Sequence, residues 1–599
     1  MSGLFNEASL VLVPSGYKSG KVYSEVPTNG DGDLSFTRSN DTATRVNSAG
    51  LIEKVRTNLV PNGLLFNGST GVLYTTIPSD SPISGLSSMR ITKNEAAGTL
   101  RYGQQTISAS VLNGSISYTI SAYFKYDGYN TTTSLEFNNS YQFGGTGWIQ
   151  NIDIASTGVT LQAPSNCTSK VTNVGNGWYR VEVTFVNGAS PSGSPVTGLL
   201  KVASTLSTGE GFLTAAPQFE TGDIATEYIP TTSAAVSVGM LANVPRLDYS
   251  GGGCPKLLLE PQRTNLVTYS EQFDNAYWTK FNATITSNAT TSPNGTLTAD
   301  KLVENSVNGN HFIYRSQATF TPSASYFQSW YVKAGERYKV RIQDASDGTF
   351  FAAYNLNTGS LIDEGTNTIG NTNITPLLNG WYRLTLLLNQ ATSAKYAAII
   401  LLPDSYTAGD SITYQGDGTS GVYIWGAQLE LGSYATSYIP ATSTAVTRTQ
   451  DSASKTGISS LIGQTEGTLY YEGVVSANAE VCNLNRSTIN AVFIYTRSTG
   501  EIAAYVYADS NGINLLSTVQ ASSRFKCAIA YKSNSIAFYV NGNLIAENTT
   551  ATFTPNITLD RFDIGYGGYV SSANAQTLNQ ALLFKTRLSN AQLASLTTL

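Results

Sequence analysis

The chain has 599 residues, a formal net charge of −5 and only 13% charged residues, against roughly 25% in an average globular protein. A weak negative charge of this kind excludes an electrostatic surface for nucleic acid or for an anionic membrane. The hydrophobic content of 41% is enough to build packed cores, which excludes a largely disordered chain.

The composition favours β-structure. The chain contains 35 Tyr and 54 Gly, and Ser, Thr and Asn are abundant throughout. Thr, Tyr and Val suit a pleated sheet, whereas Asn and Gly suit its turns. At about 150 residues per domain, the length predicts three or four domains. The four cysteines are scattered without a CxxC pair, so we expect isolated thiols and neither a disulfide framework nor a metal site.

The first 55 residues are expected to form short strands and turns. "ASLVLVP" and "GKVYSEVP" alternate apolar with polar residues, and "NGDGD" (Asn29–Asp33) is expected to be a Gly/Asp turn because the late Glu of a calcium loop is missing. We find no basic, apolar signal segment and no apolar run of about 18 residues. We therefore expect no membrane insertion, and a chain that stays in a cytoplasm unless a larger assembly carries it out.

Three phrases occur twice in the same order, about 200 residues apart, which indicates a tandem duplication. They are "RTNLV" at residues 56–60 and 263–267, "NGWYR" at 176–180 and 379–383, and a longer segment that begins "QFETG" at 218 and "QLELG" at 428. We therefore expect module one at residues 56–236 and module two at 262–446, separated by a linker at 237–261.

Both modules have the pattern of a β-sandwich or jelly roll. Alternating segments such as "YRVEVTFV" and "YKVRIQDA" are separated by turn clusters about every ten residues. Ser156–Gly158 and Asn357–Gly359 are expected to be hairpin turns in matching places. Neither copy contains a convincing amphipathic helix.

A third unit is expected at residues 464–599, after a polar linker at 447–463. "YVNGNLI" predicts a hairpin with Asn541 and Gly542 at its turn. The end of the chain predicts a strand followed by a short helix.

The residues that both modules share are interpreted as architecture, because an aromatic ring at the head of a strand covers one end of a core. This applies to the two Trp-Tyr-Arg triplets of the "NGWYR" phrases. Arg56 with Glu220, and Arg263 with Glu430, are expected to form structural ion pairs between the first and last strands of each module.

The sequence singles out no catalytic, cofactor-binding or metal site. The one histidine, His311, has no nucleophile and acid around it, and is expected on the surface or in a turn. Two carboxylates suffice for glycoside hydrolysis, and the 40 acidic residues supply many pairs, but no pair stands out. We expect no cofactor and no enzymatic activity.

At this point the sequence resembles known families over nearly its whole length. Residues 464–599 resemble the concanavalin A-like (laminin-G-like) lectin fold in "FYVNGNLIA", "FDIGYGG" and "ALLFKTRLSNAQLASL". The modules resemble the carbohydrate-binding-module-like jelly rolls of tailed-bacteriophage virion proteins in "PRLDYSGGGCPKLLLEPQRTNLVTYSEQFDNAYWTK" (245–280), "NGWYR" and "GAQLELGSYATSYIP". The text at 33–55 is similar to fibre-like proteins of phages, including those that infect gut Bacteroidetes.

This chain departs from the resemblance at one place. In such proteins "ATRVNSAGLIE" is followed within a few residues by "NVPRLDY", but here almost all of module one separates them. Module one is therefore expected to be an insertion, and residues 1–55 and 237–262 are expected to pack together.

The resemblance implies an all-β fold, with tandem β-sandwich or jelly-roll modules followed by a concanavalin A-like sandwich. It implies a structural component of a bacteriophage virion, a head or tail fibre or spike that displays glycan-binding modules for host adhesion, with residues 1–55 as a candidate virion anchor. Its partners would be capsid, portal-vertex or tail proteins and host surface glycans, and it would lie on the particle surface. Phage depolymerases usually present long β-helical repeats, and none is visible in this sequence.

Two other functions stay open. The chain could be a capsid decoration or connector protein that binds other virion proteins and no sugar. A secreted bacterial glycan-binding accessory is disfavoured, because no signal segment precedes the modules. Phage fibres are usually cyclic and most often threefold, which multiplies weak affinity, so we expect a homotrimer. The sequence has no heptad seam, so module faces or the first 55 residues would have to hold it.

Candidate ligand-binding residues are aromatics present in only one module, because shared aromatics are assigned to the fold. They are Trp148, Tyr126 and Tyr129 in module one, and Trp330 in module two, where module one has Ala122. Flat aromatic faces suit the C–H surfaces of sugars. The alternative is that Trp330 fills core space, and for Trp148 both interpretations stay open.

Overall fold

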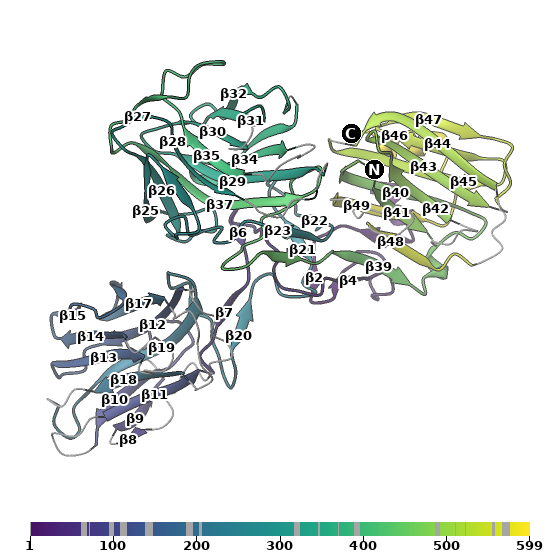
Figure 1. Ribbon diagram of the computed structural model, residues 1–599. Helices are drawn as coiled ribbons and strands as arrows, with labels where there is room; N and C mark the ends of the chain where they lie inside the picture. The colour runs from purple at the N-terminus through teal and green to yellow at the C-terminus, as the bar shows by residue number, and fades with distance from the viewer. Residues whose placement is uncertain are drawn as a thin grey trace. The chain divides into compact units, whose positions relative to one another are not determined.

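The computed structural model is built almost entirely from antiparallel β-sheets (Figure 1), which confirms the all-β fold class. The structure describes residues 2–599 except 62–68, 71, 79, 95–100, 108–116, 138–147, 187–195, 203–205, 317–320, 322–323, 345–347, 369, 389–395, 478, 485–490, 509–510, 522, 554–557 and 566–575. Two compact units divide the chain. Unit 1 comprises residues 1–54, 240–295 and 299–599, and unit 2 comprises residues 55–239 with 296–298.

Unit 2 is module one, a sandwich of two six-stranded sheets. One sheet has the order β16 (Thr168–Gly175), β17 (Trp178–Val186), β12 (Ser117–Lys125), β19 (Gly211–Thr221), β10 (Ser88–Lys93) and β9 (Val72–Ile77). The other has the order β15 (Gly158–Leu161), β14 (Trp148–Ala155), β13 (Thr131–Phe137), β18 (Val196–Val202), β11 (Arg101–Ile107) and β8 (Ser69–Thr70). A short ladder of β7 (Arg56–Asn58) and β20 (Val236–Val238) brings the two ends of the module together.

Module two, in unit 1, repeats this strand order. Its first sheet is β33 (Thr372–Pro376), β34 (Trp381–Leu388), β29 (Tyr326–Ala334), β37 (Gly421–Leu431), β26 (Ala299–Glu304) and β25 (Ala283–Thr290). Its second sheet is β32 (Ser360–Glu364), β31 (Phe351–Asn355), β30 (Lys339–Asp344), β35 (Tyr396–Leu401), β28 (His311–Ser316) and β24 (Thr279–Phe281). Two short ladders complete it: β23 (Arg263–Asn265) with β38 (Val446–Arg448), and β27 (Asn308–Gly309) with β36 (Tyr414–Gln415).

The repeated "NGWYR" phrase forms a tight hairpin turn in both modules. Asn176 and Gly177 join β16 to β17 with φ of 52° and 77°, and Asn379 and Gly380 join β33 to β34 with φ of 58° and 77°, the latter pair within a short 3-10 turn (Leu378–Gly380). Asn and Gly adopt left-handed backbone with little strain. The pair forms a two-residue loop in module one, where Gly175 pairs with Trp178, and part of a longer loop in module two, where the last ladder pair is Pro376 with Tyr382. The phrase therefore recurs because it forms the turn of the edge hairpin.

Other shared residues also hold each module together. Arg180 donates to the Ser121 hydroxyl at 3.1 Å and lies over the Tyr123 ring at 5.6 Å. In module two, Arg383 donates to the Ser329 hydroxyl at the same distance of 3.1 Å and lies over the Tyr331 ring, also at 5.6 Å. The architectural interpretation of these residues therefore agrees with their contacts.

One of the two expected ion pairs is present. Arg263 lies 4.0 Å from Glu430. No ion pair joins Arg56 to Glu220, although both residues are described. Instead, Glu220 accepts hydrogen bonds from the backbone N–H and the hydroxyl of Thr226, at 2.7 and 2.6 Å, and this satisfies the buried carboxylate without the arginine.

The C-terminal sandwich contains two large sheets. One has the order β21 (Arg246–Asp248), β22 (Lys256–Leu259), β49 (Gln576–Phe584), β40 (Glu466–Val475), β45 (Phe525–Lys532), β46 (Ile536–Val540) and β47 (Asn543–Asn548), with β1 (Leu10–Leu12) also on β49. The other has the order β2 (Tyr17–Lys18), β3 (Lys21–Val22), β4 (Leu34–Thr37), β39 (Ser452–Thr456), β48 (Arg561–Ile564), β41 (Glu480–Leu484), β42 (Ala491–Thr496), β43 (Glu501–Ala508) and β44 (Asn511–Gln520).

Segments far apart in the sequence thus complete one sandwich. Strand β1 pairs along residues 581–583 of β49, and β22 pairs along residues 576–578 of the same strand. Strand β4 pairs with β39, which lies inside the stretch 447–463 that the sequence suggested as a linker. The N-terminal segment and the stretch 237–261 therefore supply strands to the third unit, and their backbone hydrogen bonds cover sheet edges that would otherwise be open.

The two helices lie at the ends of the described chain. Helix α1 (Ser2–Glu7) forms where short strands and turns were expected, and its Leu4 and Phe5 pack on an apolar cluster that includes Leu593 and Leu596. Those leucines belong to α2 (Asn590–Thr597), the expected C-terminal helix, which begins with a capping box between Ser589 and Gln592. Apolar contact with this cluster accounts for the unexpected helix.

Candidate functional site

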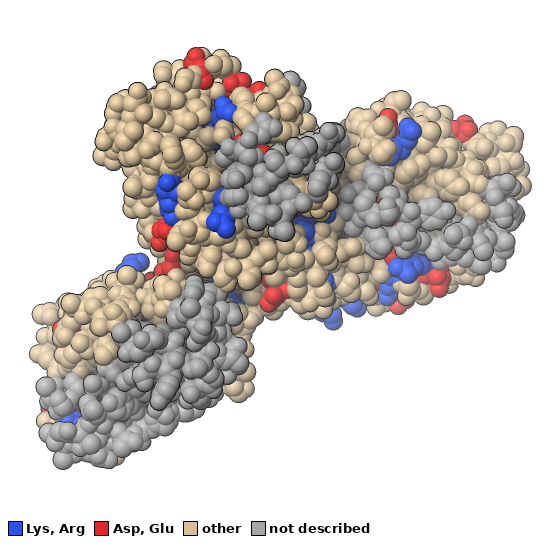
Figure 2. All heavy atoms as spheres, viewed as in Figure 1, with Lys and Arg blue, Asp and Glu red and all other residues tan. Residues whose placement is uncertain are grey.

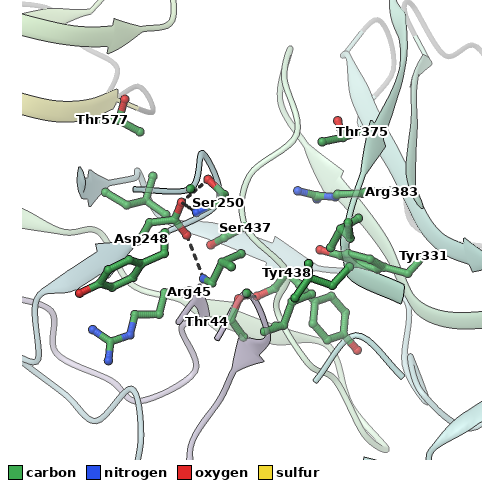
Figure 3. Close-up of a pocket in the computed structure, with 18 of the residues that line it drawn as sticks. Thr44, Arg45, Asp248, Ser250, Tyr331, Thr375, Arg383, Ser437, Tyr438 and Thr577 are labelled. Atoms are coloured by element: carbon green, nitrogen blue, oxygen red, sulfur yellow. Dashed lines mark hydrogen bonds between the residues drawn. The ribbon is translucent and has the colours of Figure 1, made fainter. Parts of the chain in front are cut away.

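A pocket of about 730 Å³ lies within unit 1 (Figure 3). Three parts of the chain line it: the hairpin of β5 (Arg45–Val46) and β6 (Ile52–Glu53), the hairpin of β21 and β22, and the end of module two formed by residues 375–383 and 435–438. Its volume falls in the range of roughly 300–1,000 Å³ that small-ligand sites usually have.

One wall carries a fixed carboxylate. Asp248 accepts a hydrogen bond from the backbone N–H of Val46 at 2.9 Å, and further bonds from the backbone N–H and hydroxyl of Ser250 (Figure 3). These donors come from both hairpins, so they hold the carboxylate in one orientation. The wall thus offers an acceptor in Asp248 and a hydroxyl in Ser250.

The facing wall carries a guanidinium group. Arg383 and Thr375 lie on the module-two side, across from Asp248 and Ser250 (Figure 3). Arg383 donates to the carbonyl oxygen of Thr436 at 2.6 Å, which fixes its place over the Tyr331 ring. Its Nε is buried and has no hydrogen-bond partner among the described residues.

The hairpin β5–β6 is docked on aromatic rings of module two. Ile52 is 5% exposed and packs in a cluster with Tyr331, Trp381, Trp425 and Tyr438. Its backbone N–H donates to the carbonyl oxygen of Pro293 at 3.0 Å. Since the hairpin is held by both apolar and polar contacts, this side of the pocket is preformed.

In module one, the corresponding aromatic rings are covered by a residue of the module itself. There the counterparts Tyr123 and Trp178 pack with Ile83, which belongs to the loop between β9 and β10 of that module. A residue of its own loop therefore takes the place that Ile52 takes on module two. This difference explains how module two is integrated into unit 1 while module one forms a unit of its own.

A buried ionic network lies beside the pocket. Arg246 and Arg448 each lie 2.7 Å from the Glu260 carboxylate, and Arg246 also contacts Asp451, which lies 3.2 Å from Arg38. Burial alone would raise the pKa of Glu260, but the Arg448 and Arg246 charges hold the pKa of that carboxyl well below its usual range. Glu260 is therefore a permanent anion that joins the β21–β22 hairpin to module two.

The hairpin and its ion pair are also duplicated. Arg45 pairs with Glu53 at 2.8 Å, as Arg246 pairs with Glu260. Both glutamates lie three residues before the repeated "RTNLV" phrase, so the duplication of the hairpin could have been predicted from the sequence. The repeating unit is therefore a hairpin followed by a jelly roll.

Trp330 is not accessible to a ligand in this structure. Its side chain is 0% exposed in the core of module two, stacked on Phe273 at 5.6 Å and next to Trp278 at 5.4 Å. The alternative that it fills core space fits this position, and we leave Trp330 out of the site.

The other three candidates lie in module one and not in the pocket. Tyr129 is 38% exposed, and Tyr126 is half-buried against the module core. Trp148 begins β14, but its side chain lies outside the described residues. The pocket was not foreseen, because its lining residues come from stretches that lie far apart in the sequence.

His311 is buried, so the expectation of a surface or turn histidine was wrong. Its Nδ1 lies 2.8 Å from the carbonyl oxygen of Asn282, and its ring contacts Tyr414 edge to face at 4.8 Å. It begins β28 with its side chain on the inner side, where the neighbouring strands cover it.

Two general features bear on function. No described helix is long and apolar enough to cross a membrane. Within the described ranges, no group of three or more His, Cys, Asp or Glu side chains is placed to hold a metal ion. On the face shown in Figure 2, acidic and basic side chains are scattered among neutral ones.

No protein-family model matches the sequence, and a search of curated proteins found no match. Solved structures do show similarity. The CBM40 of Ruminococcus gnavus IT-sialidase, bound to α2,3-sialyllactose, is 15% identical, over 23% of this chain and 84% of that one, with a TM-score of 0.21. The CBM22 tandem of Paenibacillus barcinonensis Xyn10C is 11% identical, over 63% and 100%, with a TM-score of 0.18.

Domains LG4-5 of the mouse laminin α1 chain are also similar. They are 11% identical, over 47% of this chain and 92% of that one, with a TM-score of 0.17. TM-scores this low do not determine a function for this chain.

Proposed function

We propose that this protein is a glycan-binding adhesion protein of a bacteriophage virion, and that the pocket of unit 1 binds a saccharide. The observation that carries the proposal is the facing arrangement of Asp248 and Arg383 across a pocket of about 730 Å³.

The chemistry of the two walls matches that of a sugar. Each sugar hydroxyl both donates and accepts, so it can donate to the Asp248 carboxylate and accept from the Arg383 guanidinium. Ser250 and Thr375 add hydroxyls that can do either, and Tyr249 adds an aromatic ring that suits C–H surfaces. A mixture of a few placed polar groups with aromatic surface is usual in small-ligand sites.

The site is proposed to bind without catalysis. Glycoside hydrolysis needs a carboxylic acid with a raised pKa that can give its proton to the leaving group. Asp248 and Glu260 are the two acidic residues that line the pocket, and the pKa of Glu260 is held well below its usual range. Glu260 therefore cannot serve as the general acid, because its pKa is lowered and not raised.

The virion part of the proposal is supported by the resemblance of the hairpin and module text to phage fibre proteins. The protein would be a fibre or spike on the head or tail, attached to other virion proteins and exposed to host glycans. Trimeric assembly would multiply a weak affinity by simultaneous binding. Light scattering of the purified chain tests the trimer, and a monomer at micromolar concentration would contradict it.

The pocket is tested with a matched pair of substitutions. Arg383→Ala and Arg180→Ala each remove one hydroxyl contact, one carbonyl contact and one stacking contact on a tyrosine, but only Arg383 lines the pocket. We expect both variants to lose similar stability and only Arg383→Ala to lose binding on a glycan array and to host cells. Equal binding by both variants would exclude the pocket, and a wild-type chain that binds no glycan but binds virion proteins would favour the connector function.

A further inference from the structure

Four aromatic rings form a continuous cluster on one face of the nine-stranded sheet, which we call the aromatic ladder: Phe493, Tyr495, Tyr505 and Tyr507. Phe493 and Tyr505 lie opposite each other on β42 and β43, with ring centroids 5.0 Å apart. Tyr495 lies 5.6 Å from Phe493, and Tyr507 lies 6.0 Å from Tyr505.

The ladder lies on the face of the sheet that points away from the sandwich core. Its residues alternate along β42 and β43 with Val492, Ile494, Ile502, Ala504 and Val506, which belong to the core cluster. Residues two apart in a strand share a face, so the rings are on the opposite side. Tyr495, Tyr505 and Tyr507 are half-buried, and part of each ring is therefore accessible.

Gly512 shows how far the Tyr505 side chain reaches. A Cβ at position 512 would be 1.5 Å from the Tyr505 hydroxyl oxygen, so the side chain extends from β43 across β44. The ring is half-buried, so part of it is exposed. The planes of Phe493 and Tyr507 are within 26° and 16° of this ring, so the rings share nearly one orientation.

Polar side chains continue the same row at both ends of the paired rings. Across five strands, Asp563, Asn483, Phe493, Tyr505 and Asn514 are successive partners in the sheet register. Asn514 accepts a hydrogen bond from the Tyr495 hydroxyl at 2.7 Å. The Asn483 side chain is almost fully buried, and its Oδ1 has no hydrogen-bond partner among the described residues. Since Asn483 is covered by protein and Asn514 is exposed, Asn514 is the polar end that a ligand can reach.

We propose that the aromatic ladder is a second saccharide site, which binds a linear oligosaccharide along the half-buried rings of Tyr495, Tyr505 and Tyr507. Pyranose rings present apolar C–H surfaces that stack on aromatic faces, and their hydroxyls find donors and acceptors in Asn514 and the tyrosine hydroxyls. This inference rests on the proposed glycan-binding function, and it assigns part of that function to the C-terminal sandwich.

Gly512→Ala gives the sharpest test. The added methyl group would take the place of the Tyr505 hydroxyl, which is the free end of a side chain, so the ring would swing off the sheet while the exposed strand keeps its fold. Gly348→Ala is the control, because a Cβ at that position meets no atom within 4 Å. Tyr507→Ala is a second variant, which removes a ring without adding a group.

The intact chain is titrated with cellohexaose, xylohexaose and mannohexaose by calorimetry, alongside thermal unfolding of each variant. For a hexasaccharide that the wild type binds, we expect Gly512→Ala and Tyr507→Ala to weaken binding about tenfold with unchanged unfolding temperature, and Gly348→Ala to have no effect. Arg383→Ala is measured in the same series. If only Arg383→Ala weakens binding, the ladder is overturned and the proposed function stands. If no probe binds the wild type at about 1 mM, the ladder is overturned, and the glycan array decides the proposed function separately.

Discussion

Arg246 and Glu260 form an ion pair of 2.7 Å whose side chains are 0% and 5% exposed. Arg45 and Glu53 repeat it at 2.8 Å in the first hairpin, where the side chains are 11% and 27% exposed. The duplication has thus placed the same pair in two environments. Because the strength of an ion pair depends on its burial, the two copies allow a direct comparison of stability within one chain.

Glu260→Gln should destabilise unit 1 strongly. The substitution removes the anion between Arg246 and Arg448 and leaves two buried positive charges, which costs about 3–5 kcal/mol when one partner of a buried pair is lost. Glu53→Gln, the control, should cost about 1 kcal/mol or less because that pair is partly solvated. Urea unfolding measures both. Equal losses would contradict the role of burial.

The stability of unit 1 should also fall in acid because of Glu260. Its pKa is lowered in the folded state, so its contribution is fully present above the unfolded value of about 4.3 and is lost as the pH falls toward the folded pKa. We expect the unfolding temperature of the wild type to drop below about pH 4, and that of Glu260→Gln to drop less over the same range. Scanning calorimetry from pH 7 to pH 2.5 gives both curves, and parallel curves would refute the assignment.

Module one should be removable. Its two ends meet, since Arg56 on β7 pairs with Val238 on β20, and the long segment of unit 2 runs from Val55 to Gly239. Deletion of residues 56–238, with a short Gly-Ser bridge, should therefore leave a soluble, folded unit 1. Circular dichroism and light scattering check this. An aggregated product would show that unit 1 depends on the module.

Trp330→Ala should affect stability and not binding. Removal of a fully buried tryptophan costs about 3–5 kcal/mol, which corresponds to a fall of roughly 6–20 °C in unfolding temperature for a domain of this size. The exposed Tyr129 should tolerate alanine with less than about 0.5 kcal/mol. Trp148→Ala is the matching test for ligand contact in module one. Lost glycan binding at unchanged unfolding temperature would support a contact there, and retained binding would remove Trp148 from the candidates.

The parts of the fold that follow from local rules were predictable from the sequence. The turn of Asn541 and Gly542 is confirmed with φ of 50° and 83°, and the strands on either side of it are as expected. The duplicated phrases also led to two modules of equal strand order, because repeated text builds repeated structure. In each case neighbouring residues carry the whole signal.

Long-range pairing was not predictable. Strand β1 pairs with β49 and strand β4 pairs with β39 through backbone hydrogen bonds. Because nearly every residue carries the same backbone groups, the sequence of a strand does not identify its partner strand. The pocket and the buried position of His311 depend on the same long-range packing. The aromatic ladder could have been predicted from the sequence, since alternate residues of "AVFIYT" and "EIAAYVYA" are aromatic. It was missed because candidate ligand-binding residues were restricted to aromatics found in only one of the two modules, and this excluded the third unit.

The pairing of β1 with β49 also sets an order of events during synthesis. The Ser9 hydroxyl donates to the carbonyl oxygen of Leu583, a residue 574 positions later. At about 5–20 residues per second, a ribosome needs about half a minute to two minutes to make the intervening chain. Each module can complete its own sheets in that time, whereas β1 and β22 must wait for the final strand. A chain that terminates before β49 therefore leaves these strand edges unpaired.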